Sequence, residues 1–214
     1  MVYNRVCGAG NLPWGGAMLV FYAERLVFLS MPKTGTTAYE SALRARADMV
    51  VSNPPELKHA SLYRYDRFFR PIFEKVCKTE LEVMAVVREP VSWLGSWYRY
   101  RRRPFMAGKP NSTEGITFDD FVSAYSQGER PAFANVGGQA KFLEGRPGGQ
   151  RAAHLFRYEE REKLDAFLET RLGIRPVTAR ENVSPEMDLT LSPATEAKLR
   201  RKCAEDFALW ESLG

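Results

Sequence analysis

The chain has 214 residues, which fits one domain or one domain with an appendage. Apolar residues make up 44% of the chain and charged residues 27%, a balance that excludes a disordered or fibrous protein. Lys and Arg number 31 against 26 Asp and Glu, and the net charge of +5 favours an anionic partner, with nucleic acid, a phosphate cofactor and a sulfated sugar all admissible.

Strands and helices alternate in the hydrophobic pattern after a loose leader over residues 1–17, which is rich in Gly, Pro and Asn. We expect a single domain over residues 18–214, and Met18 is a candidate for the true start. β-rich runs predict strands over residues 18–22, 25–30, 82–87 and 152–157, the first two as a hairpin, and residues 49–52 are a further strand candidate. Helical spacing and capping residues predict helices over residues 36–48, 64–78, 91–103, 117–125, 136–143, 160–172 and 192–213.

This alternation predicts an α/β fold, a three-layer sandwich around a mostly parallel central sheet. In such folds the ligand site lies at the carboxyl ends of the strands. That rule selects three places in this chain, which follow Ser30, Val87 and Arg157.

The turn after the strand over residues 25–30 has the composition of an anion-binding loop. It reads Met-Pro-Lys-Thr-Gly-Thr-Thr over residues 31–37. Gly35 permits a tight turn, hydroxyls and free amides lie at the start of the following helix, and Lys33 adds a point charge. The lysine precedes the glycine and no GxxxxGK[ST] sequence occurs, which argues against an ordinary ATPase or kinase. We expect a phosphate site here, and a capped turn with a solvated lysine is the alternative.

Two motifs resemble those of sulfotransferases that use 3′-phosphoadenosine 5′-phosphosulfate (PAPS), in particular the bacterial carbohydrate-type members. Residues 32–37, directly after a strand, are similar to the family's 5′-phosphosulfate loop. Arg88, at the end of the strand over residues 82–87, and Ser96, eight positions later, are similar to the family's 3′-phosphate site. Independently of the family, an arginine fork and a helical hydroxyl one or two turns further on can grip one phosphate from two sides.

The resemblance covers about residues 26–159 and implies a P-loop NTPase-like sulfotransferase fold, PAPS as the sulfuryl donor and no metal. Phe156–Glu159 resembles the segment beside the adenine, so Tyr158 is expected to line the base pocket, with a core tyrosine as the alternative.

The chain departs from the family at Ala38, where an aromatic residue often follows the threonine pair. It also lacks the glycine-rich basic segment of phenol-type members, for which Arg180 is a candidate substitute. The binding residues that the resemblance implies are Lys33, Thr34, Gly35, Thr36, Thr37, Arg88, Ser96 and Tyr158.

Lys33 and His59 are the residues expected to carry the chemistry. Sulfuryl transfer, like phosphoryl transfer, depends mainly on positioning and charge stabilisation, and Lys33 is placed to neutralise the leaving oxygens. The acceptor must lose a proton, and imidazole titrates near neutrality. His59 lies in a polar loop, whereas His154 lies within an apolar strand and is expected to be structural. Glu56 is the alternative base, because several carbohydrate-type members use a glutamate soon after the phosphosulfate loop.

The acceptor is expected to be a small molecule or a carbohydrate, either neutral or anionic. The basic cluster Arg99, Arg101, Arg102 and Arg103 is either a solvated helix end or a site for an acidic acceptor. No nucleic-acid partner is expected, because no reading helix or stacking sheet accompanies these charges. A P-loop-like nucleotide kinase and a catalytically silent nucleotide-binding module are the competing functions.

Neither a bilayer span nor a secretory signal is predicted, so we expect a cytoplasmic protein. The longest apolar stretch, residues 18–29, is interrupted by charged residues, whereas a span needs about 20 apolar residues. The first residues lack a basic region followed by an apolar one. Cys7, Cys77 and Cys203 lie far apart, which predicts reduced thiols rather than a disulfide framework or a cysteine-rich zinc site.

Overall fold

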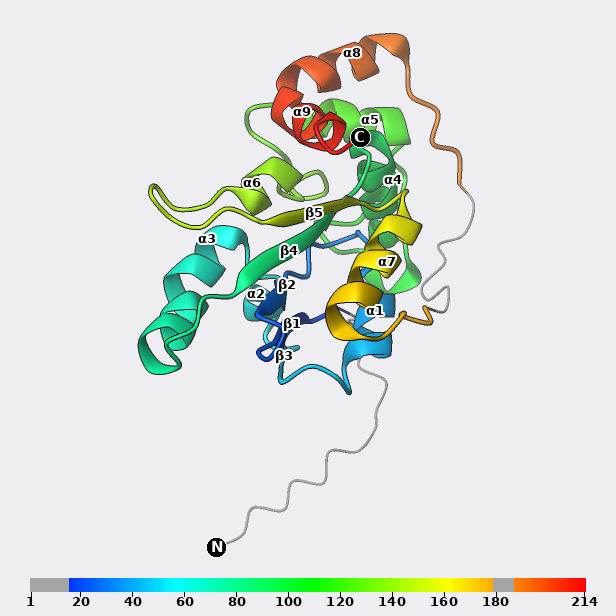
Figure 1. Cartoon of the computed structure of the whole chain (residues 1–214). Helices are drawn as coiled ribbons and strands as arrows, with labels where there is room; N and C mark the ends of the chain where they lie inside the picture. Colours follow the sequence, from blue (N-terminus) through cyan, green and yellow to red (C-terminus); the bar gives the residue numbers. More distant parts are fainter. Residues whose placement is uncertain (1–15, 179–186) are drawn as a thin grey trace, which may run out of the picture.

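The computed structural model describes residues 16–178 and 187–214, so most of the expected leader, and also Arg180, lie outside the described residues. At its centre is a five-stranded sheet with the strand order β3-β1-β2-β4-β5 (Figure 1). The strands are β1 (Met18–Phe21), β2 (Leu26–Phe28), β3 (Met49–Val51), β4 (Glu82–Val87) and β5 (His154–Arg157). The predicted strands are confirmed, including the further candidate that became β3.

The strand directions confirm an α/β fold but make the sheet mixed rather than mostly parallel. The pairs β2–β4 and β4–β5 are parallel, whereas β1 is antiparallel to both β2 and β3. The reversal comes from the predicted hairpin, whose turn contains Arg25 at a φ of 53°. The carboxyl ends of β2, β4 and β5 therefore lie along one edge of the sheet.

Helices cover both faces of the sheet, which gives the fold three layers. Alternate residues of a strand point to opposite faces. Phe28 and Val86 pack on one face against α1 (Thr36–Leu43) and α7 (Arg161–Leu172). Their sequence neighbours point to the second face, which explains why these strands are apolar at nearly every position.

The segment between β3 and β4 covers the second face. It consists of α2 (Pro55–Lys58), α3 (Leu62–Arg64) and the π-helical turns η1 (Tyr65–Phe69) and η2 (Ile72–Val76). The Ser61 hydroxyl caps α3 by accepting a hydrogen bond from the Arg64 amide, so this helix begins two residues before the predicted boundary. Pro71, which has no backbone donor, lies between the two wider turns.

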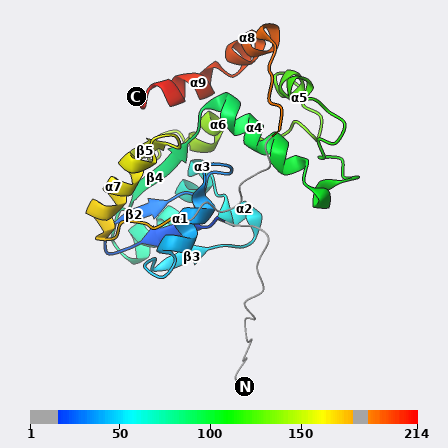
Figure 2. The same ribbon diagram turned by 90° about the vertical axis from the view of Figure 1, so that its right-hand side faces the viewer.

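The remaining helices gather at the end of the molecule opposite β3 (Figure 2). They are α4 (Pro90–Arg101), η3 (Pro104–Met106), α5 (Phe118–Tyr125), α6 (Gln139–Leu143), α8 (Pro193–Lys202) and α9 (Ala204–Glu211). Aromatic residues such as Trp93, Phe121 and Phe207 form their common core. The single helix predicted over residues 192–213 is divided at Cys203, where φ is −120° and ψ is 33°. Within the described ranges, no helix is long and apolar enough to cross a bilayer.

Candidate functional site

The loop between β2 and α1 has the backbone of an anion-binding turn. Lys33 and Gly35 have φ values of 69° and 75°, a conformation that is easy for glycine and uncommon for lysine. Gly35 is the N-cap of α1 and offers no side chain to the first amides of the helix, which leaves them for an anion. A Cβ atom at Gly35 would lie 2.9 Å from the Tyr158 ring, so a larger residue does not fit. The strand, turn and helix expected over this region are therefore present.

The threonine hydroxyls of this loop have different surroundings. Thr34 is fully buried and donates to the Met31 carbonyl oxygen (2.9 Å). The Thr36 hydroxyl lies 3.0 Å from that of Ser30. The Thr37 hydroxyl has no hydrogen bond to any residue that the structure describes. Thr34 and Thr36 thus shape the loop, and Thr37 has a hydroxyl left for a ligand.

Arg88 connects the loop to the ends of β4 and β5. Its Nη1 donates to the Lys33 carbonyl oxygen (3.3 Å), and its guanidinium carbon lies 4.3 Å from the centre of the Tyr158 ring. Its Nε donates to the Ser92 hydroxyl (2.9 Å). Ser96, the serine expected from the sequence, lies one turn further along α4 and has no hydrogen bond to Arg88. The three strand-end positions selected from the sequence therefore meet in one place.

Buried polar groups fix the peptide that carries Arg88. Gln139 is fully buried; its Oε1 accepts from the Arg88 amide (2.8 Å) and its Nε2 donates to the Arg88 carbonyl oxygen (2.7 Å). The Glu89 carboxylate caps α4 by accepting from the amides of Val91 (3.0 Å) and Ser92 (2.6 Å). These bonds set the direction in which the arginine leaves β4.

Lys33, Arg88 and Arg99 form a cluster of cations, and none of them has a salt bridge to a carboxylate among the described residues. The Lys33 ammonium lies 3.4 Å from the centre of the Tyr100 ring and 5.1 Å from that of Trp97. Burial, together with the positive charge of neighbouring arginines, lowers the pKa of Lys33 to about 7. Burial also lowers the pKa of both arginines. A bound anion would relieve the repulsion within this cluster.

The arginine cluster at the end of α4 has both structural and site-facing members. Arg101 is buried and donates to two backbone carbonyl oxygens (2.7 and 2.9 Å). Arg102 donates to the Tyr98 hydroxyl (2.9 Å). Beyond the effect of burial, the positive charges of Arg103, Arg101 and Arg99 all lower the pKa of Lys33, in that order of size, and Arg99 also lowers the pKa of Arg88. Arg101 and Arg102 support the fold through these hydrogen bonds, whereas Arg99 and Arg103 add positive charge next to Lys33.

His59 lies beside the loop as a neutral base. Its Nδ1 is 2.7 Å from the Ser30 carbonyl oxygen, which can only accept, so Nδ1 carries the proton and Nε2 has the free lone pair. Burial lowers the pKa of His59. His154 pairs with Glu82 at the other end of the sheet (2.9 Å), as expected for a structural histidine. Glu56, the alternative base, is exposed and does not line the cavity beside His59.

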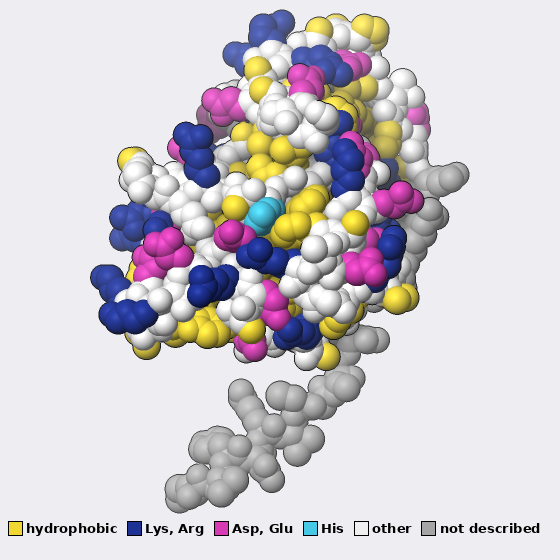
Figure 3. Space-filling view, in the orientation of Figure 1, with side chains coloured by type: hydrophobic (Ala, Val, Ile, Leu, Met, Phe, Trp, Pro, Cys, Tyr) yellow, Lys and Arg dark blue, Asp and Glu magenta, His cyan; other side chains and the backbone are white. Residues whose placement is uncertain are grey.

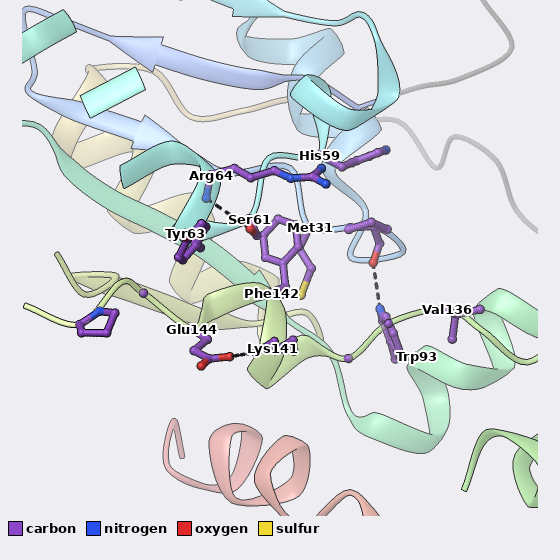
Figure 4. A pocket seen from close by; sticks show the side chains of 15 residues that line it. Met31, His59, Ser61, Tyr63, Arg64, Trp93, Val136, Lys141, Phe142 and Glu144 are labelled. Atoms are coloured by element: carbon purple, nitrogen blue, oxygen red, sulfur yellow. Dashed lines mark hydrogen bonds and ion pairs between the residues drawn. The ribbon is translucent and has the colours of Figure 1, made fainter. Parts of the chain in front are cut away.

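A cavity of about 480 Å³ lies beside His59, within the size range of small-ligand pockets. Met31 of the loop and Phe142 of α6 are among the residues that line it (Figure 4). Trp93 of α4 forms another wall, and its indole donates to the Pro32 carbonyl oxygen (2.8 Å). The cavity therefore adjoins the loop at the residue before Lys33, next to the candidate base.

Comparison with known proteins gives no relative for this chain. No protein-family model, no curated protein and no solved structure matches it. The interpretation of the site therefore depends on its geometry and on the motifs in the sequence.

Three residues of the site were missed by sequence reasoning. Ser92 carried a usable signal, because a residue four positions after Arg88 on a helix lies within reach of its guanidinium. Gln139 lies 51 positions from its partner, and no local pattern connects the two. Tyr100 lies between arginines in the sequence, and its contact with Lys33 depends on how α4 packs against the loop.

Proposed function

We propose that this protein is a sulfotransferase that moves a sulfuryl group from PAPS to a hydroxyl or amine of an acceptor, with a P-loop NTPase-like sulfotransferase fold. The observation that carries the proposal is the convergence of residues 31–37, Arg88 and Tyr158 around three cations that lack a carboxylate partner among the described residues. A ligand with negative charge at two positions would stabilise such a cluster.

The two anion sites suit the two ends of PAPS. The first amides of α1 and the Thr37 hydroxyl suit the 5′-phosphosulfate. Arg88, together with the serines of α4, suits the 3′-phosphate, and Arg99 supplies a further cation. Because Arg88 also donates to the Lys33 carbonyl oxygen, the sites are close enough to hold one nucleotide. Tyr158, packed between Gly35 and the arginine, is the candidate neighbour of the base.

When bound, PAPS supplies the sulfuryl group and a phosphate leaving group. Lys33 neutralises the negative charge that grows on the leaving oxygens. It must be protonated to do so, and a neighbouring anion raises its pKa from the value of about 7. The Nε2 atom of His59 takes the proton of an acceptor held in the adjacent cavity, while the Nδ1 hydrogen bond to Ser30 orients the ring.

Transfer of radiolabelled sulfate from PAPS to a panel of phenols, amino sugars and oligosaccharides tests this proposal. We expect Lys33→Ala and His59→Asn to reduce the rate by about a hundredfold or more. His154→Asn is the matched control and should keep the wild-type rate, because His154 lies at the opposite end of β5. Phosphoryl transfer from ATP and Mg²⁺, without sulfuryl transfer from PAPS, would contradict the proposal and favour a kinase.

A further inference from the structure

The helical segment over residues 62–76 carries an apolar stripe that the fold does not bury. One side of the segment packs into the core against the sheet. On another side, Phe68, Ile72 and Val76 follow one another at intervals of four residues, which makes them neighbours on the helix surface. They are 55%, 50% and 75% exposed. A row of large apolar side chains in water indicates a surface that another structure covers.

Positive charge surrounds this stripe. The cations of the segment and its end are Arg64, Arg67, Lys75 and Lys78, and none has a salt bridge to a carboxylate among the described residues. Arg70 pairs with both Asp66 and Glu74, and residues 62–78 as a whole hold five cations against these two carboxylates, a net charge of +3. Lys and Arg side chains gather with exposed apolar ones at the lower left of the molecule in Figure 3, over this segment.

We propose that Phe68, Ile72, Val76 and the cations beside them, Arg64, Arg67 and Lys75, form a docking face for an anionic lipid bilayer. An apolar stripe bordered by Lys and Arg is typical of helices that lie in the plane of a membrane interface. Anionic headgroups attract such cations, so the charge of the face is complementary to the lipid surface.

A second copy of this chain would fit the docking face poorly. Self-association through a two-fold axis would bring the same cations face to face, which is unfavourable. Three apolar side chains also provide far less than the ~800 Å² that each partner buries in a standard protein interface. A lipid surface requires neither a matched partner shape nor a large flat interface.

The docking face is next to the candidate site. The segment after α3 projects from the side of the sheet in Figure 1, away from α8 and α9. Tyr63 and Arg64, at the start of the segment, also line the cavity beside His59. A molecule docked on a bilayer would therefore hold this cavity close to the lipid surface. The inference stands without the proposed function, since it concerns binding to lipid alone.

Cosedimentation of the full chain with vesicles, in the absence of nucleotide, tests the docking face. We expect binding to vesicles of equal parts phosphatidylcholine and phosphatidylglycerol, and little binding to phosphatidylcholine alone. Phe68→Ser combined with Ile72→Ser should weaken binding by about tenfold or more. Ile174→Ser combined with Val177→Ser removes two other exposed apolar residues and should leave binding unchanged.

The contribution of the cations is tested with Arg67→Glu combined with Lys75→Glu, which should also weaken binding to the anionic vesicles by about tenfold or more. Arg201→Glu combined with Lys202→Glu on α8 makes the same change in net charge and should have little effect. Circular dichroism melting confirms that each variant is folded. The proposal is overturned if the wild type does not prefer the anionic vesicles, or if the control variants lose as much binding as the docking-face variants. It is also overturned if light scattering finds a dimer that the Phe68 and Ile72 changes dissociate.

Discussion

Lys33 lies against the Tyr100 ring, and its charged neighbours are arginines rather than carboxylates. Burial of the ammonium, followed by the positive charge of these arginines, makes the charged form unfavourable and lowers the pKa of Lys33 to about 7. The residue therefore changes its charge close to neutral pH when no anion is bound. An anion at the start of α1 reverses the balance, because it stabilises the ammonium. In the proposed reaction, Lys33 is therefore protonated once the sulfuryl donor is bound.

Binding of 3′,5′-diphosphoadenosine should consequently take up a proton above pH 7. Below pH 7 Lys33 is already protonated in the free protein, so it adds no pH dependence there. Above pH 7 the neutral amine of Lys33 must gain a proton when the nucleotide binds. The affinity for 3′,5′-diphosphoadenosine should therefore fall by up to about tenfold for each unit of rising pH, until the pH reaches the raised pKa of Lys33 in the complex. Calorimetry in buffers of different ionisation enthalpy measures the uptake. Lys33→Arg, which stays charged, should abolish it; uptake that persists in that variant would assign it to another group.

At the scale of elements, α4 and α6 position Arg88 and the other side chains of the candidate site. Along α4, Ser92, Ser96 and Arg99 follow one another at intervals of four and three residues, on the side of the helix near Arg88. The short helix α6 contributes Gln139, whose amide group bonds both backbone polar groups of Arg88. The arginine is therefore held by two helices that come after it in the chain.

Gln139→Leu should damage the site as well as the fold. It leaves the amide and the carbonyl of Arg88 without their partner, and each such buried group costs about 1–3 kcal/mol of unfolding free energy. Gln150→Leu is the matched control, because Gln150 donates to the Leu81 carbonyl oxygen (2.7 Å) just before β4, at the opposite end of the strand. Chemical denaturation should show both variants destabilised.

Only Gln139→Leu should weaken binding of 3′,5′-diphosphoadenosine, by about tenfold or more, since it releases Arg88, the residue proposed to bind the 3′-phosphate. Equal affinities of the two glutamine variants would show that Gln139 has no positioning role.

The elements that depend on local sequence were predictable, and those that depend on packing were not. Thr117 and Ser192 cap α5 and α8 as expected, because a hydroxyl three residues before a free amide is a local signal. Gly173 ends α7 with a φ of 69°, directly after the predicted end of that helix at residue 172. The choice between Ser92 and Ser96 depends on the side-chain conformation of Arg88, which helical periodicity does not determine. The loop and Lys33 could be predicted because their signal lies in one short stretch of sequence. The contact of Lys33 with Tyr100 could not, because it depends on how α4 packs against the loop.

At the scale of the whole molecule, parts of the chain that are far apart in sequence support one another at the sheet edge. Asp206 of α9 is buried and accepts a hydrogen bond from the Ala140 amide at the start of α6 (2.7 Å). Because α6 carries Gln139, this bond connects the C-terminal helix to Arg88. Arg157, beside the candidate base pocket, donates to backbone oxygens near the end of α9 (3.0 and 3.2 Å). The helical end of the molecule is therefore part of the framework of the site.

The central claim is that the Lys33 turn and Arg88 bind the two phosphates of one nucleotide. Calorimetric titration with 3′,5′-diphosphoadenosine and with adenosine 5′-monophosphate, in the wild type and in Arg88→Ala, tests it most directly. A charged hydrogen-bonded contact is worth roughly 1.5–3 kcal/mol, so the wild type should prefer the diphosphate by about tenfold to a hundredfold. Arg88→Ala should bind both nucleotides equally, whereas Arg102→Ala should keep the preference. A wild type that does not distinguish the nucleotides, or an Arg88→Ala variant that keeps the full preference, would contradict the account.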